Sequence, residues 1–240
     1  ALFKKEKYFG DHKVLTYKLT SQNDMAYVTR YFDKITGKIC FEISQVLNAN
    51  NVENYILYSS RSNGYKLGIK CSDDKYIKLQ ALKAKVLGNY GFNSQKSTRK
   101  IIKELEKISP DVVHLHILHG WYVNFPILFN CLKNMDVPVV WTMHDCWAFT
   151  GHCPHFEYIK CNKWQSGCFN CPQYRDYPDS RLDTSKILYK YKKKYFTNIN
   201  NLIIVTPSEW LSALIKNSYF STNTVKVINN GIDLSVFKPT

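Results

Sequence analysis

The 240-residue chain lacks an apolar run long enough to form a membrane-spanning helix, and no secretory leader is visible at its N-terminus. It has only 10 glycines, and no dinucleotide-binding fingerprint can be built from them. Internal repeats, clear low-complexity tracts, nucleophile-elbow sequences and nucleic-acid-binding motifs are also missing. We therefore expect a protein without a membrane span, in a reducing, cytoplasmic compartment.

Acidic residues are scarce relative to basic ones. The 19 Asp and Glu residues stand against 33 Lys and Arg, and the formal net charge is +14. Such a charge favours anionic partners such as nucleic acid, an anionic membrane face or phosphorylated ligands. A solvated, lysine-rich surface explains the same excess. Hydrophobic residues make up 45% of the chain, which is enough for one sizeable core.

Two hydrophobic periods alternate from about residue 25 onward. This alternation predicts an α/β fold with a parallel sheet and helices on both faces. Ser97 is the expected N-cap of the second helix. Residues 61–92 show little helical or strand periodicity. Residues 14–19 are compatible with an extra strand. The expected strands are 27–32, 55–58, 112–117, 139–143, 202–205 and 225–228, and the expected helices are 37–48, 97–108, 126–133, 188–195 and 208–215.

The tripeptide Thr36, Gly37 and Lys38 lies between a predicted strand and a predicted helix. A glycine there lets backbone N–H groups and the helix N-terminus approach an anion such as a diphosphate. From these three residues alone, an ordinary structural turn is favoured.

Two histidines, His114 and His116, lie two positions apart on a predicted strand, so their side chains point to the same face. His119 and Gly120 follow in the next loop. Two imidazoles on one face suit a metal ion or a substrate, and histidines satisfied within a core are the common alternative.

A second pair of polar residues, His144 and Asp145, follows the predicted strand 139–143. Strand ends in α/β proteins are where ligands bind. The next segment is dense in Cys, His and Trp and shows neither a helical nor a strand period, so packing alone does not explain it.

Five of the eight cysteines lie in that segment. Cys153, Cys161, Cys168 and Cys171 have the spacing C-x7-C-x6-C-x2-C, and four thiolates in so short a loop are able to close a tetrahedral zinc site. A structural zinc would stabilise a loop with little regular hydrogen bonding. Reduced, packed cysteines are the alternative. The substitute ligands are Cys146, His152 and His155.

Residues 188–196, LYKYKKKYF, interleave lysines with tyrosines. On a helix, this pattern suits an anionic membrane surface with the rings at the interface. A lysine-rich exposed helix whose aromatic residues pack inward is the alternative, and it is slightly favoured.

Four strings of the sequence together resemble one family. They are PDVVHLHILHGWYVNFPILF, PVVWTMHDCWAFTGHC, IVTPSEWL and VINNGIDLSVFKP. In this order they resemble family 4 glycosyltransferases, most closely the bacterial branch that builds capsular, exopolysaccharide or O-antigen sugars. The resemblance covers about residues 25–239. It implies a retaining enzyme of GT-B fold, with two Rossmann-like domains and no catalytic metal.

The resemblance also implies roles for particular residues. His144 matches the family histidine that touches the donor sugar and helps the transfer, so it is the expected catalytic residue, and Asp145 and Trp147 belong to the same string. His119 and Gly120 match a loop that borders the acceptor pocket.

Thr36, Gly37 and Lys38 match the loop that approaches the donor phosphates in this family. The glycine and serine that usually precede the threonine are Lys34 and Ile35 here, which puts phosphate contact by the first part of the loop in doubt.

The resemblance sets the expected domain organisation. We expect an N-terminal extension at 1–24, a Rossmann-like, acceptor-binding N-terminal domain at 25–228 with a Cys-rich insertion at 145–180, and the start of an interdomain linker at 229–240. The domain that binds the nucleotide-sugar donor is expected to lie beyond this chain, which should be inactive alone.

The expected function is sugar transfer to a glycan or lipid-linked glycan, with the basic surface held at the inner face of the cytoplasmic membrane. The alternative is a zinc-containing, basic module that binds nucleic acid and has no enzymatic activity. Because the lysines are spread over many elements rather than focused on one, we expect no nucleic-acid partner.

Overall fold

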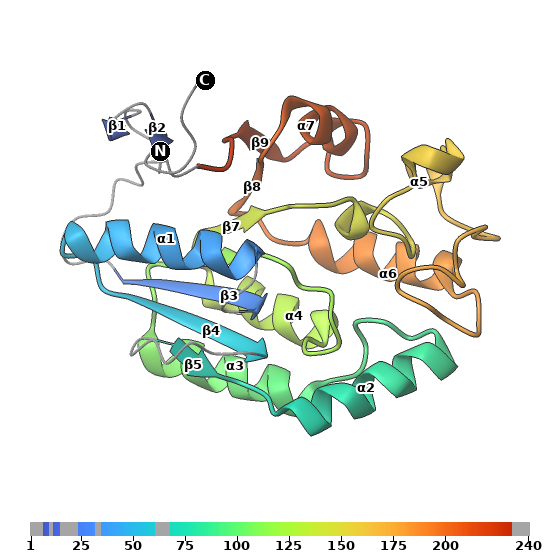
Figure 1. Ribbon diagram of the computed structural model, residues 1–240, viewed down its shortest axis with the longest axis horizontal. Coiled ribbons are helices and arrows are strands. Elements are labelled where there is room, and N and C mark those ends of the chain that lie inside the picture. The colour runs from blue at the N-terminus through green and yellow to red at the C-terminus, as the bar shows by residue number, and fades with distance from the viewer. Residues whose placement is uncertain (1–6, 10–11, 15–23, 32–34, 61–67, 232–240) are drawn as a thin grey trace, which may run out of the picture.

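The computed structural model describes residues 7–9, 12–14, 24–31, 35–60 and 68–231. At its centre is a seven-stranded sheet in the order β5-β4-β3-β6-β7-β8-β9, and all neighbouring strands run parallel (Figure 1). A separate antiparallel pair is formed by β1 (Lys7–Phe9) and β2 (His12–Val14). The strands of the large sheet are β3 (Met25–Tyr31), β4 (Asn54–Ser60), β5 (Gly68–Lys70), β6 (Val112–Leu115), β7 (Val139–Thr142), β8 (Leu202–Thr206) and β9 (Thr224–Val227).

Helices cover both faces of this sheet (Figure 1). On one face α1 (Ile35–Ala49) packs Cys40 and Ile43 against Tyr27 and Ile56. On the other lie α3 (Gln95–Ile108), α4 (Phe125–Met135), α6 (Ser185–Phe196) and α7 (Glu209–Lys216). Residues alternate between the two faces of a strand, and β6 and β7 are buried at every position, as a doubly covered parallel sheet requires. The predicted Rossmann-like α/β fold is confirmed.

The order of the strands contains a reversal. The chain passes from β3 outward to β4 and β5, and then returns to place β6 on the opposite side of β3. At such a switch point the loops that leave the two strands diverge, which opens a crevice at the carboxyl edge of the sheet. The fold therefore directs the loops after β3, β6 and β7 to one edge.

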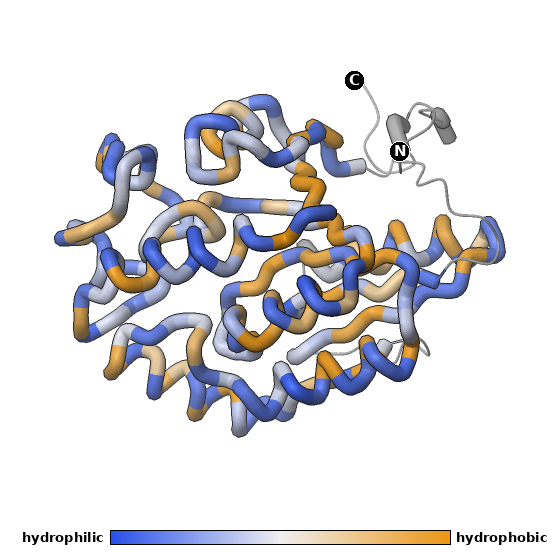
Figure 2. The backbone as a smooth tube through the Cα atoms, turned by 180° about the vertical axis from the view of Figure 1, so that it is seen from behind, coloured by the Kyte–Doolittle hydropathy of each residue, from blue (hydrophilic) through white to orange (hydrophobic). Residues whose placement is uncertain are grey.

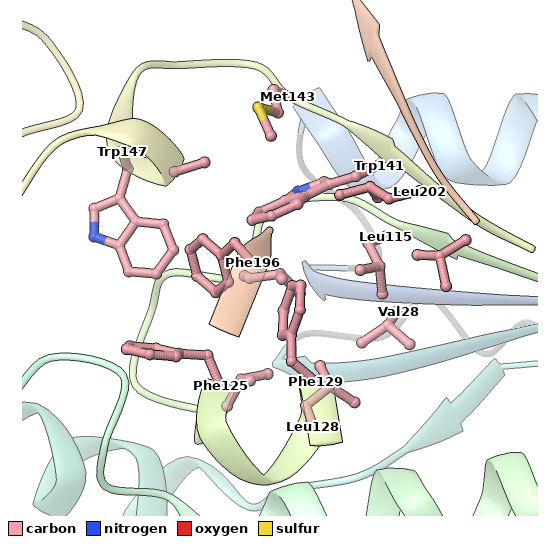
Figure 3. Close-up of a cluster of buried hydrophobic side chains, with 14 of the residues drawn as sticks. Val28, Leu115, Phe125, Leu128, Phe129, Trp141, Met143, Trp147, Phe196 and Leu202 are labelled. Atoms are coloured by element: carbon pink, nitrogen blue, oxygen red, sulfur yellow. The ribbon is translucent and has the colours of Figure 1, made fainter. Parts of the chain in front are cut away.

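The larger core is built around Phe196, at the end of α6 (Figure 3). Its ring centroid lies 4.5 Å from that of Phe129, 5.0 Å from Trp141 and 5.1 Å from Phe125. Contacts of this kind add specific geometry to the burial of apolar area. Seen from the opposite side, the helices alternate between hydrophobic and hydrophilic segments, as helices with one buried face do (Figure 2).

Residues 143–184 join β7 to α6 with little regular structure, so the predicted long Cys-rich loop is confirmed. The loop contains only the 3-10 turns η1 (Trp147–Phe149) and η2 (Glu157–Ile159) and the short helix α5 (Lys163–Ser166). Nowhere in the described ranges is a helix both long and apolar enough to cross a membrane.

The structure corrects two predicted boundaries. α3 begins at Gln95, so Ser97 lies within its first turn, and its hydroxyl donates to the carbonyls of Ser94 and Tyr122. The first predicted helix begins at Ile35 rather than at Gly37. Gly37 has no positive φ that would end or delay a helix, so it continues the helical backbone.

Residues 61–92, which gave little signal, contain β5 and the helix α2 (Asp74–Leu87). The ends of α2 are marked by ordinary caps. The Asp73 carboxylate accepts from the N–H of Tyr76 at 2.7 Å, and Gly88 takes a left-handed conformation at the C-terminus. The helix is hard to see in the sequence because several of its leucines are exposed. Of the proposed extra strand at 14–19, Val14 is the last residue of β2, and residues 15–19 lie outside the described residues.

We expect Phe196→Ala to lower the free energy of unfolding by about 3–5 kcal/mol, because it leaves a cavity among several rings. Ile187→Ala, on the same helix but 56% exposed, should change it by about 0.5 kcal/mol or less. Urea unfolding followed by circular dichroism measures both. Equal losses in the two variants would contradict this account of the core.

Candidate functional site

Four histidines gather where β6 and β7 end. His114 lies on β6 and His116 follows it, while His119 belongs to the next loop and His144 follows β7. Because β6 and β7 are parallel neighbours, their carboxyl ends lie together, on the β7 side of the switch point. The sheet thus brings together side chains that are about 28 positions apart in the sequence.

Asp145 holds His119, in the loop after β6, in place beside the loop after β7. One carboxylate oxygen lies 2.7 Å from Nε2 of His119, and the other accepts the backbone N–H of Trp147 at 2.9 Å. Burial raises the pKa of Asp145. The attraction of His119, with the hydrogen bonds from His119 and Trp147, outweighs burial, and the pKa lies below its ordinary value. Asp145 is therefore an anion that holds the loops after β6 and β7 together.

His144 contacts His116 rather than its sequence neighbour Asp145. Nδ1 of His116 lies 3.2 Å from Nε2 of His144, and the two rings stack with centroids 5.5 Å apart. Nε2 of His114 lies 2.8 Å from the hydroxyl of Thr142, and its ring centroid is 4.3 Å from that of His116. The same-face prediction for His114 and His116 is confirmed.

Burial keeps these imidazoles neutral. It lowers the pKa of His114 to about 3 and that of His144 to about 4, and it lowers the pKa of His116 well below the ordinary value. The nearby rings add to the effect, because a second positive charge in the cluster would repel the first. At His144 the Asp145 carboxylate opposes this lowering of the pKa, but burial outweighs it. At neutral pH all three rings are uncharged.

The contacts of His116 select one tautomer for the pair. Nε2 of His116 is buried and has no hydrogen-bond partner. An orphaned acceptor is more readily tolerated there than an orphaned N–H group, so the hydrogen of His116 belongs on Nδ1. That N–H then donates to Nε2 of His144, and the hydrogen of neutral His144 is left on Nδ1. His144 is thereby prepared to donate a hydrogen bond through Nδ1.

Arg30, near the end of β3, is a site residue that the sequence analysis missed. Its guanidinium lies 4.7 Å from the ring centroid of Trp121, and Nη1 donates to the hydroxyl of Tyr177 at 3.2 Å. Gly120 has φ +128°, and a Cβ there would collide with the Arg30 side chain. A charged residue in the otherwise uncharged strand 25–31 was the available signal. Gly120 is thus required by the close approach of Arg30.

The first turn of α1 follows β3 at the same edge of the sheet. Gly37 is buried, and the exposed ammonium of Lys38 lies 3.6 Å from the Glu42 carboxylate one turn later. Lys34 lies outside the described residues. No contact joins this turn to the histidine cluster among the described hydrogen bonds and ion pairs, so its approach to phosphates stays a prediction.

The four predicted zinc ligands lie in the loop, apart from the histidine cluster at the ends of β6 and β7. Cys153, Cys161, Cys168 and Cys171 all line one small cavity together with His152. Throughout the described part of the chain, no group of three or more Cys, His, Asp or Glu side chains is arranged to hold a metal ion. The spacing motif therefore converges in space, and the zinc site stays a prediction.

Comparison with known proteins places these residues in a family. Residues 37–236 match the family model of Glycosyltransferase Family 4. A protein of Escherichia coli (strain K12), WcaC, provisionally described as a colanic acid biosynthesis glycosyl transferase, is 31% identical over 133 residues. These residues are 52% of this chain and 32% of WcaC.

Two solved structures are also similar, both of UGT2 from Phytolacca americana. One is complexed with UDP-2fluoro-glucose and pterostilbene, and the other is the apo form. Each is 10% identical to this chain, with a TM-score of 0.45, and the match covers 88% of this chain. It covers 54% of the complexed structure and 52% of the apo structure.

The buried histidines predict a loss of stability at acid pH. Their folded pKa values lie below the ordinary value, so the unfolded chain binds protons more readily once the pH falls below about 6.5. The stability that comes from keeping these rings neutral is fully present above that pH and is lost as the pH falls toward 4. Each histidine lowers the free energy of unfolding by up to about 1.4 kcal/mol per pH unit.

Urea unfolding at about pH 7 and about pH 5 measures this loss. His114→Gln should make the loss smaller, because it removes one titrating group. Gln165→Ala, at an exposed position of the loop, should leave it unchanged. A chain whose stability is the same at both pH values would contradict the neutral, buried state of these rings.

Proposed function

We propose that this chain, which belongs to Glycosyltransferase Family 4, is the acceptor-binding part of an enzyme that moves a sugar from a nucleotide-sugar donor to a glycan or lipid-linked glycan. The family match over residues 37–236 is the observation that carries the proposal. The likeness to WcaC, described as acting in colanic acid biosynthesis, supports a role in surface polysaccharide synthesis in bacteria. It also favours this function over the nucleic-acid alternative.

The matched region is 32% of the length of WcaC, so the whole enzyme is expected to be longer. We assign the donor nucleotide mainly to a second Rossmann-like domain, and we expect residues 1–240 to be inactive alone. The first turn of α1, with Thr36, Gly37 and Lys38, is proposed to face the donor phosphates. The segment of His119 and Gly120, supported by Trp147 and Asp145, is proposed to border the acceptor.

His144 is proposed to touch the donor sugar. Its neutral ring, with the hydrogen on Nδ1, suits donation to a sugar oxygen better than proton abstraction. Such a contact lowers the barrier when it strengthens as the bond to the leaving nucleotide breaks. The proposed reaction retains the anomeric configuration and uses no catalytic metal. Charge on the departing diphosphate is met by helix N-termini and basic residues.

We further propose that the enzyme works at the cytoplasmic face of an anionic membrane. On α6, Tyr189 is buried and Lys192 is fully buried. The helix by itself therefore exposes fewer of the lysines and tyrosines of LYKYKKKYF to a membrane than the sequence suggests. Exposed apolar side chains continue onto α2, whose Lys85 carbonyl accepts the N–H of Arg181 in the segment before α6. We call this the α2–α6 surface; its apolar residues are Leu79, Leu82, Leu87, Leu182 and Ile187, and its exposed lysines include Lys78, Lys83, Lys186 and Lys190.

His144→Ala in the full-length enzyme should lower kcat by about 10²-fold or more, because the contact to the sugar is lost. His144→Asn places an N–H near the position of Nδ1 and should keep more activity than His144→Gln. Release of nucleoside diphosphate from a panel of nucleotide sugars, with a lipid-linked glycan as acceptor, measures these rates. The exposed Gln165 of the neighbouring loop provides the control, and Gln165→Ala should behave as the native enzyme. Native activity in His144→Ala would remove this role for the histidine.

Vesicle sedimentation tests the α2–α6 surface. The chain should pellet with vesicles containing phosphatidylglycerol but not with phosphatidylcholine alone. Replacing Lys78, Lys83 and Lys190 with Gln should weaken binding by about 1 kcal/mol per lysine.

A charge-matched variant with Gln at the exposed α3 residues Lys96, Lys103 and Lys107 should bind as the native chain does. Leu79→Gln combined with Leu82→Gln should also reduce binding, since apolar contact is lost. Binding without preference for the anionic lipid, or equal losses in the two lysine variants, would contradict a specific membrane face.

A further inference from the structure

The Cys-rich loop has a small core of its own. Phe149, Phe156 and Trp164 are buried, and the rings of Phe156 and Trp164 stack with centroids 5.3 Å apart. Between these rings and residues 168–173 lies the cavity that all four motif cysteines line. The loop folds around this cavity with only two 3-10 turns and one helical turn, so its backbone hydrogen bonds contribute little order.

The sulfur atoms already interact in pairs. Sγ of Cys153 and Sγ of Cys171 are hydrogen-bond partners, and Cys161 and Cys168 lie close enough to affect each other electrostatically. The backbone N–H of Gly151 donates to Sγ of Cys168 at 3.1 Å. Burial raises the pKa of the Cys168 thiol to about 11, and the Gly151 hydrogen bond acts in the opposite direction, toward the thiolate that binds metals.

A second, independent feature points to negative charge at this place. Lys192 of α6 is 0% exposed, and its ammonium donates to the carbonyls of Trp147 at 2.8 Å and Thr150 at 3.1 Å. The ammonium also lies 3.6 Å from the ring centroid of Trp147, and none of the ion pairs among the described residues includes it. A buried ammonium is costly unless an opposite charge is near. Cys168, Cys153 and the Asp145 carboxylate are the groups that favour its charged form, and of these only the two thiols line the cavity.

A third feature is an imidazole at the same cavity. His152 is 2% exposed and lines the cavity, and its Nε2 is buried without a hydrogen-bond partner. A nitrogen in this position is able to serve as a reserve ligand or to accept a hydrogen bond from a coordinated group. Packed thiols alone would not explain why a polar atom is left unpaired beside them.

We propose that Cys153, Cys161, Cys168 and Cys171 bind one Zn²⁺ ion as four thiolates, and that Lys192 is the buried counter-cation of this centre. Zn²⁺ suits four thiolates in tetrahedral geometry, and the four displaced protons pass to solvent. The resulting centre carries a net charge of 2−, which Lys192 partly balances. The sulfurs do not form a coordination sphere in the described structure, so binding draws them inward and closes the cavity.

Metal analysis of the 240-residue chain, purified anaerobically with a thiol reductant, tests the proposal. We expect one zinc per chain, and a Co²⁺-loaded chain should show the strong visible absorption of tetrahedral cobalt thiolate. A competing chelator should lower Tm as the metal leaves. Zinc that is clearly substoichiometric, with four freely titratable loop thiols, would overturn the site in favour of packed cysteines.

Variants locate the ion. Cys161→Ser and Cys168→Ser should each lose the metal or the cobalt spectrum, whereas Cys131→Ser, at a partly buried cysteine of α4, should retain both. Lys192→Met should weaken zinc affinity by at least about tenfold, because the centre loses its counter-charge. Metal loss in Cys131→Ser to the same extent, or unchanged affinity in Lys192→Met, would contradict the assigned ligands or the counter-cation. The cobalt spectrum of the native chain decides the coordination even where a variant fails to fold.

Discussion

The parallel pairing of β6 with β3 is the constraint on which the remaining architecture depends. It reverses the direction in which strands are added to the sheet, so the loops after β3 and β6 leave the same edge and diverge. Arg30, the histidine cluster and Asp145 all lie on loops or strand ends at that edge. Within a parallel sheet buried on both faces, a polar side chain needs a buried partner, as Asn54 has in Ser44, whereas the carboxyl edge offers the loops as partners.

Two anchoring contacts divide the polar segment that follows β7. Asp145 joins it to the loop after β6 through His119, and Lys192 joins it to α6 through two backbone carbonyls. The part nearest the sheet presents neutral imidazoles, which suit hydrogen bonding to a sugar better than proton abstraction. The part beyond it encloses cysteines and aromatic rings, which suit a structural metal. We therefore propose two separate purposes for this stretch, one at the sheet edge and one in the loop.

Much of this fold follows from hydrophobic period, because each central strand and its covering helix must bury a recognisable face. α2 was not predicted, since a helix with Leu79 and Leu82 exposed has no clean amphipathic pattern. His114 and His116 were expected on one face from strand geometry, but their contact with His144 depends on β6 and β7 being neighbours. Lys192 was read as a surface lysine, although it lies four residues from both Leu188 and Phe196 on the buried face of α6. Arg30 and its contact with Gly120 depend on loop conformations that no local pattern specifies.

The central claim is that the carboxyl edge beside the switch point, with His144 as its direct contact, receives the donor sugar of a glycosyltransferase. The most direct test is a crystal structure of the full-length enzyme with an unreactive nucleotide-sugar analogue. The account predicts that Nδ1 of His144 lies within hydrogen-bond distance of an oxygen of the sugar, while Nε2 keeps its contact with His116. A sugar bound away from this edge, or a His144 ring turned so that Nε2 faces the sugar, would contradict it.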